Sequence, residues 1–361
     1  MSRFTDLPVR ADLLGEQPYG APQIEVPVVL NVNENPYPPS VELRRAMGEA
    51  IQEAAGMMNR YPEREAVALR EDLASYLGHG LASGSIWVAN GSNEIMSHLL
   101  TVFGGPGRRM LAFTPTYSMY PEYARNTCTS YVTVPRHSDF TVDADLVLSA
   151  IRRHDPTVVV IASPNNPTGT PTSPEVIDAI CSGTDAIVVV DEAYQEFSRI
   201  PSALPLLAAH PRLVVTRTMS KAFAMAGGRV GYLAASPQVV DACRIVRLPY
   251  HLSVQTQVLA RVALAYRDEL LSRVDELAAE CRAFQAWLRA HDYEVVPSEA
   301  NFVLFGYFRD RHALWQGLLD RGVLIRETGP EGFLRASAGR PEEMAALKRA
   351  LTEINPEGRH S

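Results

Sequence analysis

Seven short apolar runs, rich in valine and isoleucine, recur through the middle of the chain, and helix-like segments separate most of them. They occupy residues 85–91, 109–115, 129–135, 157–164, 186–194, 213–220 and 230–236. Continuous apolar strands that alternate with helices are typical of a mainly parallel sheet covered by helices on both faces. We therefore predict an α/β fold whose large domain holds a mainly parallel, seven-stranded sheet between helices.

The pattern changes near residue 252. A long helical stretch reaches residue 292 and leads into shorter apolar runs and two further helices, which predict a smaller α+β domain. Prolines are frequent in residues 17–40, and because proline disrupts helices and restricts the residue before it, this arm should be extended. We predict an N-terminal arm at 1–45 that is part of the small domain, a large domain at 46–248 and a C-terminal small domain at 249–361.

The composition describes an ordinary globular protein. The 361 residues carry a net charge of −7 and are 46% hydrophobic, which gives no general attraction to nucleic acid or to anionic membranes. Four cysteines without a Cys-x-x-Cys spacing and nine scattered histidines indicate neither a disulfide framework nor a metal site. Because no apolar run has membrane-spanning length and no signal-peptide core is evident, we expect a cytoplasmic protein.

Polar side chains follow three of the predicted strands. Asp191 and Tyr194 come directly after one apolar run, Asn166 lies in a turn after another, and Lys221 ends a third. Because ligands bind at the carboxyl ends of parallel strands, we expect these groups to meet at one edge of the sheet. A buried carboxylate needs compensation, so a plain ion pair between Asp191 and Lys221 is one interpretation. A cofactor with a protonated ring nitrogen is the other.

Lys221 is unusual in this chain. Only Lys221 and Lys348 are lysines among 34 basic residues, and Lys348 lies in a polar, helix-like segment that is typical of a solvated surface. A lysine, unlike an arginine, can lose its proton and form a Schiff base. Pyridoxal phosphate would require such a lysine, a carboxylate for its ring nitrogen, donors for its phenolate oxygen and an anion site for its phosphate.

A phosphate site is predicted where a helix begins. The Gly-Ser-Asn turn at 91–93 follows the first strand, and the backbone N–H groups at a helix start attract phosphate. Thr218 and Ser220 add hydroxyls beside the lysine, and Arg229 adds a charge-assisted contact. Each feature is weak alone, since such a turn is usually only an N-cap. Their joint order along the chain favours pyridoxal phosphate.

The chain carries, in order, NENPYPP, NRYPE, NGSNE, PTYSMYP, SPNNPTG, VVDEAY, SKAFAMAGGR and LRASAG. Together these motifs resemble the histidinol-phosphate aminotransferase family, a branch of the fold-type-I pyridoxal-phosphate-dependent aminotransferases, over about residues 10–355. SPNNPTG, DEAY and the SKA motif with its following arginine are specific for the wider group. NENPYPP, NRYPE and VRLPYHLS point to the narrower branch. Ser92-Asn93 departs from the Ala-Asp that many relatives carry, which leaves the fine substrate preference open.

The resemblance implies a role for each site residue. Lys221 would form the Schiff base and shuttle a proton, Asp191 would keep the pyridine nitrogen protonated, and Asn166 with Tyr194 would hold the phenolate oxygen. Tyr117 would stack on the cofactor ring. The cofactor phosphate would be held by Ser92, Asn93, Thr218, Ser220, Arg229 and, from a second subunit, Tyr61. The substrate pocket would contain Tyr19, Asn33, Tyr250, Arg326 and Arg335, the last of which would bind a substrate carboxylate or phosphate.

The implied activity is amino transfer between L-histidinol phosphate and 2-oxoglutarate, giving imidazole-acetol phosphate and L-glutamate in histidine biosynthesis, by a homodimer with shared active sites. An aromatic-amino-acid aminotransferase is the alternative, because it needs an aromatic pocket and the same arginine. A regulator that only senses the cofactor would need a DNA-binding module, for which we expect no room before residue 30. A dinucleotide oxidoreductase is disfavoured, because no predicted strand is followed by Gly-x-Gly-x-x-Gly.

Overall fold

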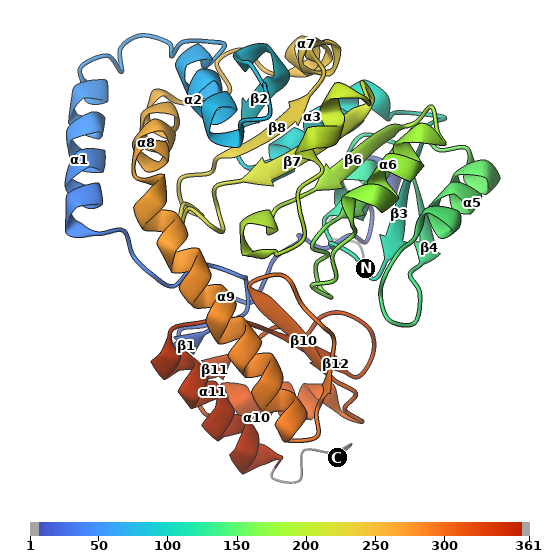
Figure 1. Ribbon diagram of the computed structural model, residues 1–361, viewed down its shortest axis with the longest axis vertical. Coiled ribbons are helices and arrows are strands. Elements are labelled where there is room, and N and C mark those ends of the chain that lie inside the picture. The colour runs from blue at the N-terminus through green and yellow to red at the C-terminus, as the bar shows by residue number, and fades with distance from the viewer. Residues whose placement is uncertain (1–6, 356–361) are drawn as a thin grey trace.

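One central sheet organises most of the molecule. In the computed structural model, which describes residues 7–355, seven strands lie in the order β2-β8-β7-β6-β5-β3-β4 (Figure 1). β8 runs antiparallel to both of its neighbours, and the other strands are parallel to one another. The predicted mainly parallel, seven-stranded sheet is confirmed. The strands are β2 (Ile86–Ala89), β3 (Arg109–Thr114), β4 (Ser130–Pro135), β5 (Val158–Ala162), β6 (Ile187–Asp191), β7 (Leu213–Thr218) and β8 (Gly231–Ala235).

Both faces of this sheet are covered. Val158 and Val160 of β5 pack in one apolar cluster, whereas Val159 and Ile161 pack in another, because successive side chains of a strand point to opposite faces. Every residue of β5 is buried, which explains why the run is continuously apolar. The helices that precede residue 250 are α1 (Val41–Ala55), α2 (Val67–Leu77), α3 (Ser92–Phe103), α4 (Tyr120–Asn126), α5 (Ala144–His154), α6 (Pro174–Ser182) and α7 (Pro237–Val246).

The helical stretch predicted from 252 to 292 is two helices. The Ser253 side chain caps α8 (Val254–Ala265) by accepting a hydrogen bond from the backbone N–H of Thr256. Tyr266 ends α8 and also precedes α9 (Arg267–Ala290), which carries two acidic residues in its first turn. In Figure 1, α9 extends from the side of the large sheet to the C-terminal unit.

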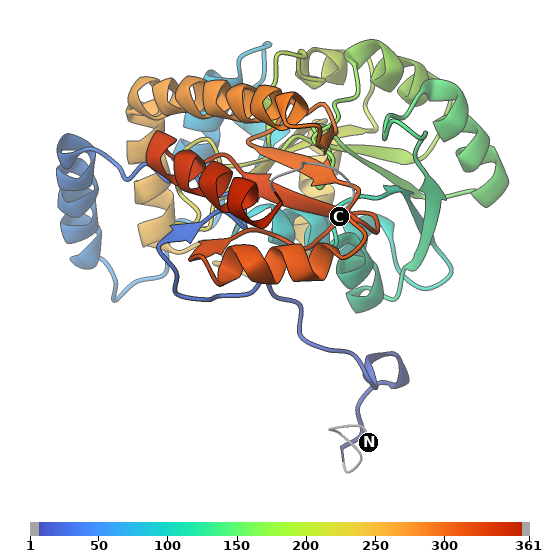
Figure 2. The same ribbon diagram turned by 90° about the horizontal axis from the view of Figure 1, so that it is seen from below.

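The C-terminal unit contains two small sheets. β10 (Phe302–Gly306) lies between β9 (Glu294–Val295) and β12 (Phe333–Ser337) and is antiparallel to both. The arm strand β1 (Val28–Val29) pairs in parallel with β11 (Val323–Leu324), so the arm adds a strand to this unit. The first described residues of the arm project away from the body (Figure 2). The two helices of the unit are α10 (Arg311–Leu319) and α11 (Pro341–Ile354).

The domain boundaries drawn from the sequence, at 45/46 and 248/249, stay predictions. The first of them falls inside α1, which begins at Val41. Within residues 7–355, no helix is long and apolar enough to cross a membrane. In the same range, no three His, Cys, Asp or Glu side chains gather in a way that could hold a metal ion.

A buried ionic cluster ties β7 to the loop after β6. The Arg217 guanidinium donates hydrogen bonds to Glu192 and Glu196, each at 2.9 Å, and all three side chains are buried. Ser202 and the backbone N–H of Ala203 also donate to Glu192. Because hydrogen bonds satisfy all three charged groups, the cluster can fix the position of this loop without leaving an unpaired ion.

Candidate active site

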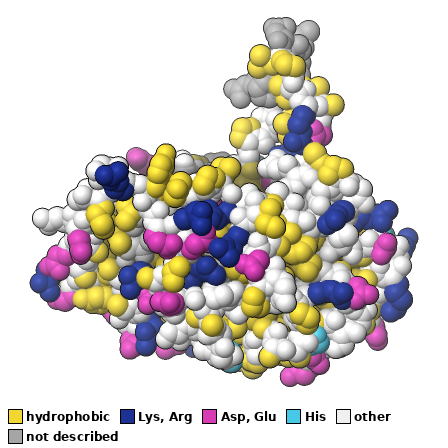
Figure 3. All heavy atoms as spheres, turned by 90° about the horizontal axis from the view of Figure 1, so that it is seen from above, with side chains coloured by type: hydrophobic (Ala, Val, Ile, Leu, Met, Phe, Trp, Pro, Cys, Tyr) yellow, Lys and Arg dark blue, Asp and Glu magenta, His cyan; other side chains and the backbone are white. Residues whose placement is uncertain are grey.

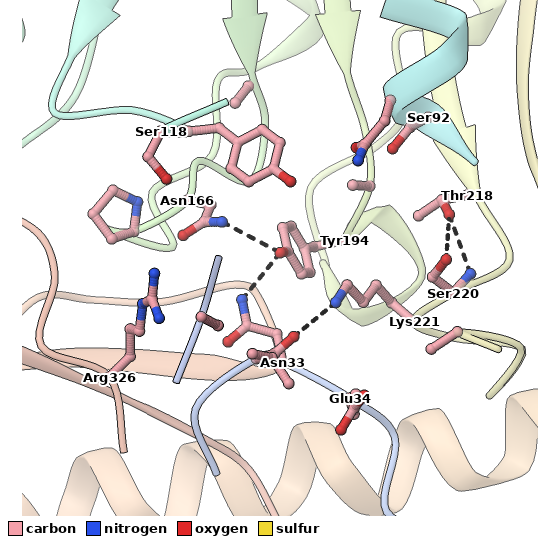
Figure 4. Close-up of a pocket in the computed structure, with 18 of the residues that line it drawn as sticks. Asn33, Glu34, Ser92, Ser118, Asn166, Tyr194, Thr218, Ser220, Lys221 and Arg326 are labelled. Carbon is pink, nitrogen blue, oxygen red and sulfur yellow. Dashed lines mark hydrogen bonds between the residues drawn. The ribbon is translucent and has the colours of Figure 1, made fainter. Parts of the chain in front are cut away.

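A cavity of about 470 Å³ lies at the carboxyl ends of β5, β6 and β7, where the arm and the C-terminal unit also reach the sheet (Figure 4). Ligand sites are expected at this edge of a parallel sheet. Tyr61 and Tyr250 do not line the cavity. The other predicted site residues do line it: Tyr19, Asn33, Ser92, Asn93, Tyr117, Asn166, Asp191, Tyr194, Thr218, Ser220, Lys221, Arg229, Arg326 and Arg335. Their individual roles stay predictions.

Lys221 lies just beyond β7 and points into the cavity (Figure 4). Its Nζ donates a hydrogen bond to the backbone carbonyl of Val32, at 2.8 Å. Burial lowers the pKa of Lys221 to about 8, and the positive charges of Arg335 and Arg229 lower it as well. The amine therefore loses its proton more readily than an exposed lysine would, which suits a nucleophile or a base.

Asp191 ends β6 and is 6% exposed. Its Oδ2 accepts a hydrogen bond from the Tyr120 hydroxyl at 2.8 Å, and its Oδ1 accepts one from the Thr216 hydroxyl at 3.1 Å. Burial raises the pKa of Asp191, and these hydrogen bonds oppose the rise. Because Asp191 and Lys221 each bond to other groups, the plain ion pair between them is not found in the described chain.

The Tyr194 hydroxyl is the centre of a second network. It accepts hydrogen bonds from Nδ2 of Asn33 at 3.0 Å and from Nδ2 of Asn166 at 3.5 Å (Figure 4). Arg335 donates to Oδ1 of Asn166 and to the backbone carbonyl of Asn31. Burial raises the pKa of Tyr194, so its phenol keeps a proton that it can donate to an oxygen atom in the cavity.

The turn before α3 is shaped by glycine. Gly91 has a φ of 85°, and the N-terminal turn of α3 that follows places Ser92 and Asn93 against the cavity. A Cβ at Gly231 would lie 2.2 Å from the carbonyl carbon of Gly91 and from the backbone nitrogen of Ser92. The backbone of β8 therefore presses directly on this turn, which only glycine at 231 permits.

Hydroxyl and guanidinium groups surround the same turn. Arg229 has a φ of 52°, and its guanidinium lies 3.5 Å from Oγ of Ser220 and from the carbonyl of Asn90. The Thr218 hydroxyl donates to Oγ of Ser220 at 3.0 Å. N–H groups at a helix start, an arginine and two hydroxyls together make a site for an anion such as a phosphate group.

Arg326 and Arg335 concentrate positive charge elsewhere in the cavity. Their backbones form an antiparallel bridge in which each N–H donates to the other carbonyl at 2.9 Å. Neither arginine forms an ion pair with a carboxylate in the described chain, and Nε of Arg335 is buried without a hydrogen-bond partner. Burial, with a smaller contribution from the charge of Arg326, lowers the pKa of Arg335 to about 10. This charge without a counterion predicts an anionic ligand.

Two tyrosine rings form aromatic walls. Tyr19 of the arm shares a hydrogen bond with Oγ of Ser118, at 2.9 Å between the oxygens. The ring of Tyr117 lines the cavity and meets the ring of Tyr120 edge-on, at 5.6 Å between centroids. Arg125 at the end of α4 forms an ion pair with Glu16 of the arm, which helps to hold Tyr19 at the cavity.

Tyr61 and Tyr250 lie outside the cavity of their own chain. Their rings stack on each other, with centroids 4.3 Å apart, and they are 79% and 40% exposed. The expectation that Tyr61 reaches the site of a second subunit stays a prediction. Tyr250 likewise does not line the cavity of this chain, and its expected place in a substrate pocket stays a prediction.

Sequence reasoning missed three groups at the site. Tyr120 follows Tyr117 by three residues, so helical spacing could have drawn attention to it. Thr216 precedes Thr218 by two residues, which places both side chains on one face of β7. Asn31 contributes a backbone carbonyl to Arg335, and a backbone group leaves no signal in the sequence.

Residues 25–351 match the family model described as aminotransferase class I and II. The chain belongs to this aminotransferase family. The resemblance seen in the motifs is confirmed, as is the enzyme class that they predicted.

The aminotransferase is similar to proteins named histidinol-phosphate aminotransferase. The one from Thermobifida fusca is 59% identical over 96% of this chain and 95% of its own length. The one from Corynebacterium diphtheriae is 49% identical over 97% of each. A crystal structure of histidinol-phosphate aminotransferase from Sinorhizobium meliloti in complex with pyridoxal-5′-phosphate has a TM-score of 0.83 and 25% identity, over 91% of both chains.

The cavity of this aminotransferase fits pyridoxal phosphate. Lys221 would offer an amine for the aldehyde, Asp191 an anion for the ring nitrogen, and Tyr194 with Asn166 donors for the phenolate oxygen. The turn before α3, with Arg229, would hold the phosphate. Gly231 of β8 approaches this turn so closely that any side chain there would displace it.

We predict that Gly231→Ala weakens pyridoxal phosphate binding by roughly tenfold or more, because the new methyl group must displace the turn that holds the phosphate. Fluorescence titration with the cofactor measures the dissociation constant. Gly48→Ala in α1 is the control, since a Cβ there meets no atom within 4 Å. Unchanged cofactor binding in Gly231→Ala would mean that this turn does not hold the phosphate.

Proposed function

We propose that the enzyme transfers the amino group of L-histidinol phosphate to 2-oxoglutarate, giving imidazole-acetol phosphate and L-glutamate in histidine biosynthesis. The observation that carries this proposal is the pair Arg326 and Arg335, which lines the same cavity as Lys221 and has no carboxylate partner in the described chain. A substrate that combines an amine with a phosphate matches such a pair.

The charged side chains that line the cavity are suited to binding two anionic groups of its ligands. Four cationic side chains face two carboxylates, Glu34 and Asp191. Asp191 is reserved for the ring nitrogen of the cofactor, so the net charge available to ligands is positive. Arg229 lies with the anion site at α3, whereas Arg335 lies on β12 and Arg326 forms an isolated bridge with it in the C-terminal unit. One phosphate would belong to the cofactor and the other to the substrate.

The side chains divide the chemistry between them. When bound, pyridoxal phosphate withdraws electrons from the bond between the substrate α-carbon and its hydrogen. Lys221, with a pKa of about 8, has a free-base fraction near neutral pH and can accept and return that proton. Asp191 would hold a proton on the ring nitrogen of the cofactor, and Tyr194 would donate a hydrogen bond to its phenolate oxygen. Tyr117 would stack on the cofactor ring, and Tyr19 would form a wall beside the substrate.

A homodimer with shared active sites is part of this proposal. Tyr61 and Tyr250 form a stacked pair at the surface, and the neighbouring Met57, Met58 and Leu248 are also exposed. Figure 3 shows apolar side chains at the surface of the face seen from above. Exposed apolar residues of this kind mark contact surfaces, and two-fold dimers are the commonest soluble assemblies. We also propose a cytoplasmic location, which the four free cysteines support.

Arg326→Gln tests the substrate. We expect its kcat/KM for L-histidinol phosphate to fall roughly 10- to 150-fold, which corresponds to about 1.5–3 kcal/mol for a lost bond to a charged group. Unphosphorylated L-histidinol should lose much less. The control Arg321→Gln removes an arginine that pairs with Glu353 away from the cavity. An equal loss of kcat/KM for both substrates would favour the aromatic-amino-acid aminotransferase instead. A wild-type enzyme that prefers L-phenylalanine to L-histidinol phosphate would favour it too.

The two lysines of the chain provide a matched pair. Lys221→Arg should fold and retain much of its cofactor affinity, yet lose turnover, because a guanidinium stays protonated and cannot act as the base. Lys348→Arg, in α11, should keep wild-type turnover. Steady-state rates with L-histidinol phosphate and 2-oxoglutarate measure both. Near-normal turnover by Lys221→Arg would exclude Lys221 as the catalytic base.

Mixed dimers test the shared site. Tyr61→Ala and Lys221→Ala are each expected to be inactive, but a mixed dimer has one site with an intact lysine from one chain and an intact tyrosine from the other. Activity should therefore return to as much as half of the wild-type value per mixed dimer. Subunit exchange is checked first with differently tagged chains. If mixed dimers are shown to be present and stay inactive, Tyr61 acts within its own chain or only packs at the subunit interface.

A further inference from the structure

Two neutral hydroxyl groups hold the carboxylate of Asp191 from behind the cavity. The Tyr120 hydroxyl donates to Oδ2 at 2.8 Å and the Thr216 hydroxyl to Oδ1 at 3.1 Å. Tyr120 is 0% exposed and is the first residue of α4, whereas Thr216 lies in the middle of β7. Both carboxylate oxygens are thus bonded by groups that do not line the cavity.

We propose that Tyr120 and Thr216 are positioning residues for pyridoxal phosphate, which fix the orientation and the negative charge of Asp191 so that it can hold the ring nitrogen of the cofactor. A phenylalanine and a valine would fill the same two places in the apolar core. The hydroxyls are therefore not required by packing. The proposal rests on the cofactor site and does not depend on which amino donor the enzyme uses.

The charge of Asp191 depends on hydrogen bonds because no cation pairs with it in the described chain. The titratable groups that face it are the hydroxyls of Tyr117, Tyr120, Tyr123 and Tyr194, all of which are neutral at physiological pH. The backbone N–H of Ala193 also donates to its carboxylate. A buried anion held only by neutral donors loses much of its stabilisation when one donor is removed.

Burial and hydrogen bonding act in opposite directions on the pKa of Asp191, and this sets the direction of the pH shift expected in the variants. Burial raises the pKa of Asp191, and the bonds from Tyr120 and Thr216 lower it, so removing either hydroxyl lets the pKa rise further. Only the ionised carboxylate can hold a protonated ring nitrogen. Cofactor affinity should therefore fall as the pH drops through the pKa of Asp191, and in the variants this loss should begin at a higher pH.

The experiment measures the dissociation constant of pyridoxal phosphate from the loaded, full-length protein between about pH 8 and about pH 5, with no amino substrate present. The acid limb of this profile is the pH range in which affinity is lost as the pH falls. Tyr120→Phe should move it to higher pH by roughly one to two pH units. Tyr131→Phe is the control, because burial alone raises the pKa of this tyrosine on β4 and its hydroxyl does not contact Asp191. Its acid limb should coincide with that of the wild type.

Thr216→Val tests the second donor on a different element. It should move the acid limb in the same direction as Tyr120→Phe, and it decides the proposal if Tyr120→Phe does not fold. An acid limb that stays at the wild-type pH in the folded variants overturns the proposal, even if their thermal stability falls. Because no amino substrate is used, failure here would leave the proposed transamination of L-histidinol phosphate untouched, and failure of that activity would leave this test valid.

Discussion

The burial of a carboxylate without a cation beside it is the constraint on which this site depends. Asp191 ends an internal strand, where burial opposes its charge, and hydroxyl and N–H donors must compensate for the lost water. β6 has to lie between β5 and β7 for Thr216 to be in reach, and α4 has to follow β3 closely for Tyr120 to be so. The order of the strands and the packing of one short helix are thus both tied to the charge of one side chain.

The arm is the element that connects this edge of the sheet to the C-terminal unit. The carbonyl of Val32 accepts the hydrogen bond from Lys221, and the side chain of Asn33 donates to Tyr194. The same Asn33 exchanges hydrogen bonds with the Ser337 hydroxyl of β12 through its backbone N–H and its Oδ1. A short segment of the arm, bent at Asn31 and Val32, thereby contacts the lysine, the tyrosine and the C-terminal unit. Its backbone groups are satisfied by these contacts instead of by a regular sheet.

Positive charge is divided between two places in one cavity. Arg229 lies beside the turn before α3, against which the backbone of Gly231 packs. Arg326 and Arg335 lie together because their backbones form a bridge in the C-terminal unit. Arginine suits both places because its guanidinium stays charged when buried. Lysine at 221 has the opposite property, since burial brings its pKa to about 8. The chain thus uses arginine to bind anions and lysine to move protons.

Local pattern determined the seven central strands and the mainly parallel sheet, because strands covered on both faces are mostly apolar, as β5 is at every position. The motif order also determined the family, and the family resemblance named fourteen residues that line the cavity. Three features came only from tertiary structure: the hydroxyl of Tyr120 on Asp191, the carbonyls of residues 31 and 32, and the surface pairing of Tyr61 with Tyr250. Each joins groups that are remote in sequence, and packing alone decides which of many possible partners a hydroxyl, a carbonyl or an aromatic ring meets.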